Sequence, residues 1–265
     1  MILAKNEAGR IRECLDSVQW AGEVLVIDDE STDDTVRLAE SLGARVLRRK
    51  MELEGRHRNW AYAQATREWI LSLDADERVT PELAQEITAL FRDGPTYDTY
   101  CIPRRNYIGE RWIRHGGWYP SAQLKLFKRS VFRWEETTVH PRAISDRPWG
   151  ALRHDLLHFS YRNEPDFIAK QARHTLLEAQ KWRADGRRVG VGKVLWRTVD
   201  RFLRSYVLKQ GFRDGRLGLF IAWMAAHYQW SSYVKYRQLK RERWTPATDP
   251  ARAAPPVPGQ ATAKP

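Results

Sequence analysis

The chain contains few of the residues and segments that mark secreted or membrane-spanning proteins. Cys14 and Cys101 are the only cysteines among 265 residues, too few for a disulfide framework and not at a metal-binding spacing. We therefore expect a reducing compartment. Met1 leads directly into a strand-like segment, so no signal peptide is expected. Residues 217–234 lack Asp, Glu, Lys and Arg but include Gly, His, Gln and Ser. That stretch is too short and too polar to predict a transmembrane helix.

Two nucleotide-binding motifs are also absent. No G-x-G-x-x-G follows the first apolar segment, and G-x-x-x-x-G-K-[ST] occurs nowhere. These absences argue against a dinucleotide-binding Rossmann domain and against a P-loop NTPase. A nucleotide can instead be held by carboxylates, of which one accepts hydrogen bonds from the nucleoside and another binds a metal that neutralises the diphosphate.

The net charge of +12 is unevenly distributed along the chain. Residues 1–150 carry 23 Lys and Arg against 24 Asp and Glu, whereas residues 151–244 carry 20 against 8. A segment that is both basic and aromatic has two usual partners, nucleic acid and an anionic membrane surface. Because the first half is nearly neutral, nucleic acid is not expected to be the partner of the whole chain.

Apolar segments alternate with helical patterns over the first 80 residues. Residues 2–4, 23–28, 45–47 and 69–74 read as strands, and a helix is predicted over residues 59–68. The second strand is apolar throughout, which is typical of a strand buried on both faces. This alternation predicts an α/β fold with a mostly parallel sheet and right-handed crossovers.

Acidic residues follow two of these strands. Asp28 and Asp29 end the second strand, while Asp74, Asp76 and Glu77 end the strand that begins at Trp69. The carboxyl ends of parallel strands meet at one edge of the sheet, where open α/β sheets bind ligands. Paired carboxylates there suit a hard divalent cation that also holds phosphates. Taken alone, the second group fits the solvated start of a helix at Thr80-Pro-Glu better than it fits a metal site.

Motifs spread along the chain resemble those of the inverting family 2 glycosyltransferases, which have a GT-A fold. They are Lys5-Asn-Glu, Asp28-Asp-Glu-Ser-Thr-Asp, Arg58-Asn-Trp-Ala and Leu73-Asp-Ala-Asp-Glu. Later segments are similar to the bacterial branch that adds glucose to the lipopolysaccharide inner core: His115-Gly-Gly-Trp-Tyr-Pro, Gln123-Leu-Lys-Leu-Phe and Val139-His140. The resemblance covers residues 1–240 and implies a GT-A catalytic domain over residues 1–150.

The resemblance also implies roles for particular residues on the donor side. Asp28 and Asp29 would contact uridine, and Arg58 and Asn59 would lie near the nucleotide. The D-x-D pair would be Asp74 and Asp76, with Asp76 the stronger candidate for direct contact with Mg²⁺ or Mn²⁺. The sugar and acceptor side would be lined by Gly116, Gly117 and Trp118, since glycine allows the backbone to approach a ligand closely.

One departure from the family concerns the general base. An inverting transferase needs a base that takes the proton of the acceptor hydroxyl. The family places an acidic residue where this chain has Ser121, which cannot serve. Glu135, Glu136 or His140 could substitute. The two glutamates fit a solvated turn equally well, and a structural role suits His140, so the base remains unassigned.

The chain after residue 150 reads as a basic amphipathic helical region over residues 151–244. In one predicted helix Leu195, Val199, Phe202, Leu203 and Tyr206 share a face, opposite Lys193, Arg197, Arg201 and Arg204. Such a helix is typical of membrane surfaces, although an ordinary helix packed on the catalytic domain has the same pattern. We expect peripheral attachment to the cytoplasmic face of the inner membrane. Residues 245–265 are rich in Pro and Ala and are predicted to be a disordered tail.

These observations predict a hexosyltransferase that moves a sugar, with glucose expected, from a UDP donor to a lipid-anchored glycan of the lipopolysaccharide core or a related cell-envelope glycan. Two alternatives stay open. One is transfer to polyprenyl phosphate, whose oxygen is already ionised and needs no base. The other is a non-catalytic protein that binds sugar nucleotides or lipid surfaces. No nucleic-acid partner is expected.

Overall fold

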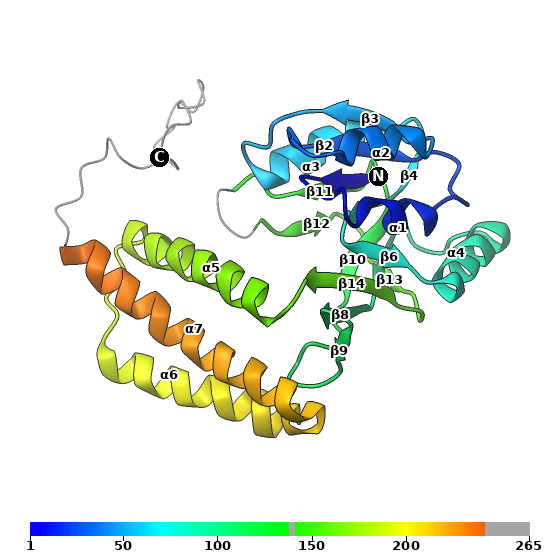
Figure 1. Ribbon diagram of the computed structural model, residues 1–265. Helices are drawn as coiled ribbons and strands as arrows, with labels where there is room; N and C mark the ends of the chain where they lie inside the picture. The colour runs from blue at the N-terminus through cyan, green and yellow to red at the C-terminus, as the bar shows by residue number, and fades with distance from the viewer. Residues whose placement is uncertain (138–140, 242–265) are drawn as a thin grey trace, which may run out of the picture.

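The computed structural model describes residues 1–137 and 141–241 (Figure 1). Its first sheet contains the parallel strands β1 (Ile2–Ala4), β2 (Leu25–Asp28), β3 (Arg45–Arg48) and β5 (Leu73–Asp74), in the order β3-β2-β1-β5. All four residues of β2 are buried, as its apolar sequence predicts. The expected α/β fold with a parallel sheet is therefore confirmed.

The segment expected to be one strand from Trp69 is divided at Ser72. β4 (Trp69–Leu71) pairs antiparallel with β10 (Gln123–Lys128), whereas β5 pairs parallel with β1. The N–H of Ser72 donates to the Lys125 carbonyl at 2.8 Å, and its hydroxyl lies 3.0 Å from the Tyr62 hydroxyl. This division joins the parallel strands to antiparallel neighbours and still brings Asp74 to the edge where β1 and β2 end.

Two further sheets and a strand pair complete this part of the chain. The second sheet has the order β13-β7-β10-β4, with β7 (Thr99–Ile102) and β13 (Gly150–Ala151). The third has the order β6-β14-β8-β9, formed by Glu77–Val79, Leu156–Tyr161, Arg104–Ile108 and Arg111–Ile113. β11 (Phe132–Trp134) pairs with β12 (Ala143–Ser145). The strands thus continue through Tyr161, past the boundary at residue 150 expected from the sequence.

Four helices accompany these strands: α1 (Ile11–Asp16), α2 (Thr35–Ser41), α3 (Glu54–Ala63) and α4 (Pro81–Asp93). The prediction of a helix over residues 59–68 was wrong in its bounds. The chain leaves the helix after Ala63 because the residues that follow bond elsewhere: Thr66 donates to the Glu23 carboxylate through both its N–H and its hydroxyl. The helix start expected at Thr80 is confirmed, since its hydroxyl accepts from the Leu83 N–H.

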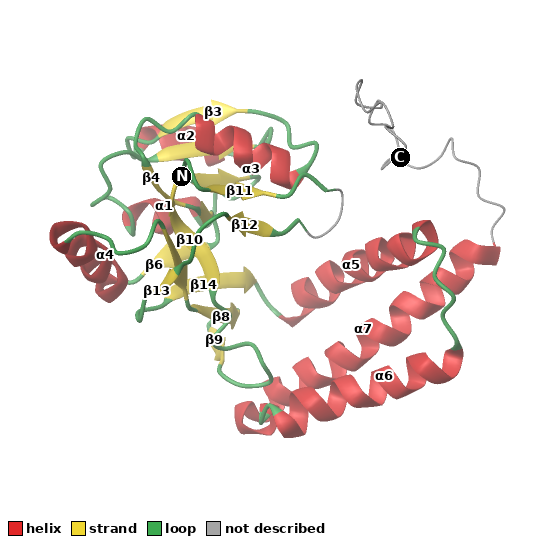
Figure 2. Cartoon of the chain, turned by 180° about the vertical axis from the view of Figure 1, so that it is seen from behind, coloured by secondary structure: helices red, strands yellow, loops and turns green. Residues whose placement is uncertain are grey.

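The C-terminal part is helical, as predicted, and forms a layer one helix thick. It comprises α5 (Glu164–Ala184), α6 (Val191–Leu203), a π-helical turn (Arg204–Leu208), a 3-10 turn (Gly211–Asp214) and α7 (Gly215–Arg241). α7 lies between α5 and α6 and packs on both (Figure 2). Among the described helices, none is long and apolar enough to cross a membrane. The predicted tail, residues 245–265, lies outside the described residues.

Candidate active site

A cavity of about 240 Å³ opens at the carboxyl ends of β1, β2 and β5. Its lining includes Lys5 and Glu7 after β1, Asp29 after β2, and Asp74 and Asp76 at the end of β5. His57 and Arg58 of α3 also line it. The cavity therefore stands where an open α/β sheet binds its ligand, and carboxylates from two strand ends meet there as predicted.

The two aspartates that end β2 have different surroundings. Asp28 is fully buried and accepts a hydrogen bond from the Ser31 N–H at 3.0 Å, so it shapes the turn after the strand. Asp29 lines the cavity, where its carboxylate accepts from Lys5 Nζ at 2.8 Å and from the Met51 N–H at 2.7 Å. Asp29 thus connects both sides of the cavity, and uridine contact by either residue stays a prediction.

Asp74 is held by two cations. Its Oδ1 accepts from Arg58 Nη2 at 2.8 Å, and its Oδ2 lies 3.3 Å from Lys125 Nζ. Burial opposes ionisation of Asp74, but Arg58 and Lys125 together hold its pKa below the ordinary value. Because both oxygens face cations of the chain, Asp74 is less available to a metal than Asp76.

Glu77 connects the residues of this cluster through hydrogen bonds. It is fully buried; one carboxylate oxygen accepts from Lys125 Nζ at 2.6 Å and from the Asp74 N–H at 2.9 Å, and the other accepts from Arg104 Nη1 at 3.2 Å. Lys125 is buried as well. The acidic residues after β5 are therefore not the cap of α4, because Thr80 supplies that cap and Glu77 points into the protein instead.

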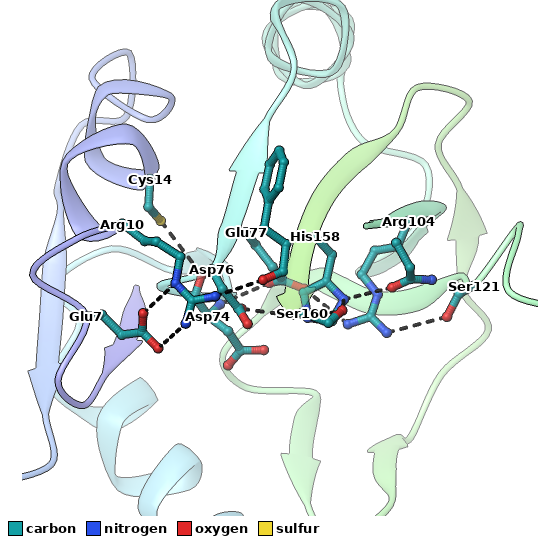
Figure 3. A network of polar contacts seen from close by, with 12 residues as sticks. Glu7, Arg10, Cys14, Asp74, Asp76, Glu77, Arg104, Ser121, His158 and Ser160 are labelled. Atoms are coloured by element: carbon teal, nitrogen blue, oxygen red, sulfur yellow. Dashed lines mark hydrogen bonds and ion pairs between the residues drawn. The ribbon is translucent and has the colours of Figure 1, made fainter. Parts of the chain in front are cut away.

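Asp76 faces the side chain of His158 across the site. Its Oδ1 lies 3.7 Å from His158 Nε2 (Figure 3). Burial raises the pKa of Asp76 to about 7, and the neighbouring carboxylates of Asp74 and Glu77 add to the increase. A carboxylate whose charge is opposed by like charges is one that a bound cation would stabilise.

The orientation of His158 is set by Asn106 of β8. The Asn106 amide Nδ2 donates to the Trp118 carbonyl at 2.8 Å, so its Oδ1 faces His158 Nδ1 at 2.7 Å as the acceptor. The hydrogen of the ring then resides on Nδ1, leaving the lone pair of Nε2 toward Asp76. Burial lowers the pKa of His158 to about 3, assisted by the positive charges of Arg104 and Lys125, so the ring is neutral.

Asp76 and His158 fit a divalent cation as partial ligands. A carboxylate oxygen and a neutral imidazole nitrogen are both suitable donors for Mn²⁺. No group of three or more His, Cys, Asp or Glu side chains within residues 1–137 and 141–241 is arranged to hold a metal by itself. Among the described residues, Asp76 and His158 are thus the two side chains that we assign as candidate ligands, and a cation held by them would complete its coordination with phosphate oxygens and water.

The Gly116-Gly117 loop packs against the C-terminal helices. Both glycines have positive φ, and the Gly116 N–H donates to the Lys209 carbonyl at 2.8 Å. A Cβ on Gly117 would lie 2.6 Å from Lys209 Cδ. Trp118 packs on Phe167, with ring centroids 6.0 Å apart. The close backbone approach that these glycines allow is thus made to the protein itself, and contact with sugar or acceptor stays a prediction.

The two candidate glutamates are engaged with arginines, and the third candidate base lies outside the described residues. Glu135 pairs with Arg142, whose hydrogen bonds keep the glutamate pKa below its ordinary value. Glu136 lies 3.3 Å from Arg56 Nε. Neither glutamate lines the cavity. His140 lies outside the described residues, so its candidacy stays a prediction.

Asn59 and Ser121 have defined places in the structure. Asn59 joins α3 to β11, since its amide accepts from the Trp134 N–H at 2.8 Å and donates to the Trp134 carbonyl at 2.9 Å. Ser121 is part of the polar network, with its hydroxyl 3.4 Å from Arg104 Nη2 (Figure 3). The position where the family carries its acidic base therefore does adjoin the site, but here it holds a hydroxyl.

The sequence reasoning missed several residues of this site: Lys125, Arg104, Asn106 and the roles of Glu77 and His158. One signal for Lys125 was visible, because a lysine stands inside the apolar run Leu124-Lys-Leu-Phe, where a strand buries its side chains. A lysine is seldom buried without a partner, which predicts a buried carboxylate nearby. Nothing local in the sequence pairs Asn106 with His158, since 52 positions separate them.

The chain is similar to known glycosyltransferases. The model of "Glycosyl transferase family 2" matches residues 1–147. An uncharacterized glycosyltransferase of Rickettsia felis is 43% identical over 91 residues, which are 34% of this chain and 32% of that protein. The chain thus matches about a third of the length of such Rickettsia relatives. The lipopolysaccharide core biosynthesis glycosyltransferase LpsC of Rhizobium meliloti is 24% identical over 257 residues, covering 94% of this chain and 95% of LpsC.

Among solved structures, S. aureus TarS (residues 1–349) is similar with 17% identity and a TM-score of 0.45, covering 89% of this chain and 90% of that one. The family match spans the parallel sheet, the cavity and the cluster of carboxylates at its edge. The chain belongs to glycosyl transferase family 2.

Proposed function

We propose that this protein is an inverting hexosyltransferase that uses a UDP-sugar donor. The observation that carries the proposal is the placement of Asp76 opposite the neutral imidazole of His158, beside a cavity at the carboxyl edge of the sheet. That arrangement suits a nucleotide diphosphate with its cation. The cavity would take the nucleoside, and the sugar would extend toward Ser121 and the Gly116-Gly117 loop.

Different residues of the chain would hold different parts of the donor. Asp76 and His158 would hold Mg²⁺ or Mn²⁺, which when bound neutralises the diphosphate leaving group. Asn106 keeps His158 Nε2 unprotonated and aimed at that position. Glu77 and Lys125 hold the backbone and side chain of Asp74, and Asp74 in turn orients Arg58 at the cavity wall.

For the acceptor we propose a lipid-anchored glycan of the lipopolysaccharide core, with glucose as the transferred sugar. The similarity to LpsC over 94% of this chain supports that class of acceptor. The resemblance of residues 115–127 to glucose-adding enzymes supports the sugar. The protein would act at the anionic cytoplasmic face of the inner membrane, as the basic character of residues 151–244 indicates.

A second candidate acceptor is polyprenyl phosphate. Ser121 occupies the position of the family's acidic base, and the two candidate glutamates are engaged with arginines. An acceptor phosphate that is already ionised needs no base, so the lack of an acidic residue at Ser121 would not oppose transfer to it. A hydroxyl acceptor instead requires a base from the undescribed His140 or from a rearranged glutamate.

The test is donor turnover with a panel of UDP-sugars, with and without Mn²⁺, followed by transfer to core oligosaccharide lipid or to polyprenyl phosphate. We expect metal-dependent turnover with UDP-glucose. Donor binding without turnover under any condition would support the non-catalytic alternative and refute the proposal. Transfer to polyprenyl phosphate alone would replace the core acceptor with the second candidate.

A further inference from the structure

Helix α6 exposes its apolar side chains to solvent. Val194 is the only residue of the helix counted as buried. Large apolar side chains are about half exposed or more along α6 and the π-helical turn: Leu195 (49%), Trp196 (69%), Val199 (53%), Leu203 (48%) and Val207 (50%). We call these five residues the α6 ridge. Leu195, Val199, Leu203 and Val207 follow one another at intervals of four, which places them along one side of the helix.

The surface of α6 is divided into three sectors. One sector is buried: Val194 packs with Tyr233 and Tyr236 of α7, and Ser205 in the following π-helical turn lies against Gly116 and Gly211. The second is the apolar ridge. The third is basic and contains Lys193, Arg197, Arg201 and Arg204, with Asp200 as the one acidic residue of the helix. The apolar side thus does not face α7, contrary to an ordinary surface helix that buries its apolar side on the protein.

The architecture explains why the ridge stays uncovered. α6 forms the outer edge of the helical layer, with α7 as its neighbour and the sheets on the far side of α7 and α5 (Figures 1 and 2). A layer one helix thick buries only the sides where its helices touch. The apolar surface continues past the ridge, because Leu208 and Phe212 in the following turns are also exposed.

We propose that the α6 ridge inserts into the interfacial region of an anionic lipid bilayer, with α6 lying in the plane of the membrane. Apolar side chains including a tryptophan would enter the acyl boundary, and the adjacent basic sector would contact lipid phosphates. This inference rests on the proposed function, because it names the surface on which a lipid-anchored acceptor is met.

Charge favours lipid over a second copy of the chain as the occupant. In a two-fold dimer that pairs the two ridges with antiparallel helices, each basic sector would border the same sector of its partner. Like charges brought together at an interface oppose association. An anionic bilayer would bury the apolar ridge and, at the same time, place lipid phosphates beside the basic sector.

The ridge is firmly connected to the candidate active site. Asp214 accepts from the N–H groups of Arg114 and His115 and lies 2.7 Å from His115 Nδ1. Gly116 bonds to Lys209, immediately after the π-helical turn. Trp118, two residues later, bonds to the Asn106 amide that orients His158. A membrane-bound α6 would therefore set the orientation of the acceptor side of the site relative to the bilayer.

The test compares two exposed tryptophans in the full chain. Trp196 belongs to the ridge, whereas Trp149 is 55% exposed on a loop of the sheet region. Trp196→Gln and Trp149→Gln are measured by flotation with phosphatidylglycerol vesicles and with phosphatidylcholine vesicles. We expect wild type to bind the anionic vesicles, Trp196→Gln to bind at least about tenfold more weakly, and Trp149→Gln to bind as wild type. The triple variant Leu195→Gln, Val199→Gln, Leu203→Gln should abolish binding.

Three results would overturn the proposal: no binding of wild type to anionic vesicles, equal loss in both tryptophan variants, or a dimer in sedimentation that only the ridge variants dissociate. Circular dichroism and UDP binding in the absence of vesicles show whether each variant is folded. Donor turnover, measured separately in solution, tests the proposed function. Loss of vesicle binding with normal turnover would therefore count against the membrane proposal alone. Loss of turnover with normal vesicle binding would count against the proposed function alone.

Discussion

The ion pair between Lys125 and Glu77 provides a quantitative test of how the site is supported. Both side chains are buried, and Lys125 Nζ lies 2.6 Å from one Glu77 oxygen and 3.3 Å from Asp74. Lys125→Met removes the cation and keeps a similar apolar length, leaving a buried carboxylate short of its partner. Breaking a buried pair in this way costs about 3–5 kcal/mol in the free energy of unfolding.

A double-mutant cycle separates the pair from general packing damage. Glu77→Gln also removes a charge, so the double variant should lose less than the sum of the single losses, with a coupling energy between about 0.5 and 3 kcal/mol. Urea unfolding followed by circular dichroism at pH 7.5 measures all four proteins. The matched control is Lys128→Met on the same strand, whose ion pair with Asp98 is partly exposed, with 31% and 17% of the two side chains accessible, and should contribute less than the buried pair. Equal losses for Lys125→Met and Lys128→Met, or additive single variants, would refute the reasoning.

Three further predictions follow from the same geometry. Asp76→Asn should lower kcat by about 10²-fold or more and leave metal-free UDP binding unchanged, because it removes the carboxylate proposed for the cation; activity near wild type would remove Asp76 from the metal site. The affinity for Mn²⁺, measured by electron paramagnetic resonance, should be about tenfold weaker at pH 6 than at pH 8, since the pKa of Asp76 is about 7 and the cation binds the ionised form, while His158 stays neutral at both values. An affinity independent of pH would contradict this. Gly218→Ala should lower the melting temperature, because a Cβ there would lie 1.8 Å from the Gly211 carbonyl oxygen, whereas Gly192→Ala, with nothing within 4 Å, should not; similar melting temperatures would contradict the packing described.

Much of the donor side could be predicted from the sequence. Asp28 and Asp29 follow a run of apolar residues, and Asp74 and Asp76 follow another. The alternation of strands and helices then places these carboxylates at one edge, since parallel strands point the same way. The cavity is found where that argument placed it.

The distinctions among these carboxylates depended on contacts that local pattern does not contain. Asp28 turned inward to bond the Ser31 N–H, and Asp74 became an ion-pair partner of Lys125 from a strand 51 positions away. The helix bounds around α3 were misplaced because Thr66 bonds Glu23, 43 positions earlier. The orientation of Asp28, the ion pair of Asp74 and the end of α3 each depend on a polar contact. Each contact forms only when the folded chain brings its two partners together.

The sequence by itself determined the class of this protein: an α/β domain with acid at its strand ends, followed by a basic amphipathic helical region. Those features follow from periodicity and composition, which act over a few residues. The tertiary structure alone decided that Asn106 aims His158 at Asp76, that Ser121 adjoins Arg104, and that the apolar side of α6 faces outward. The physical reason is that each depends on which distant surface a side chain meets, and an amphipathic pattern states that a helix has an apolar side without stating what covers it.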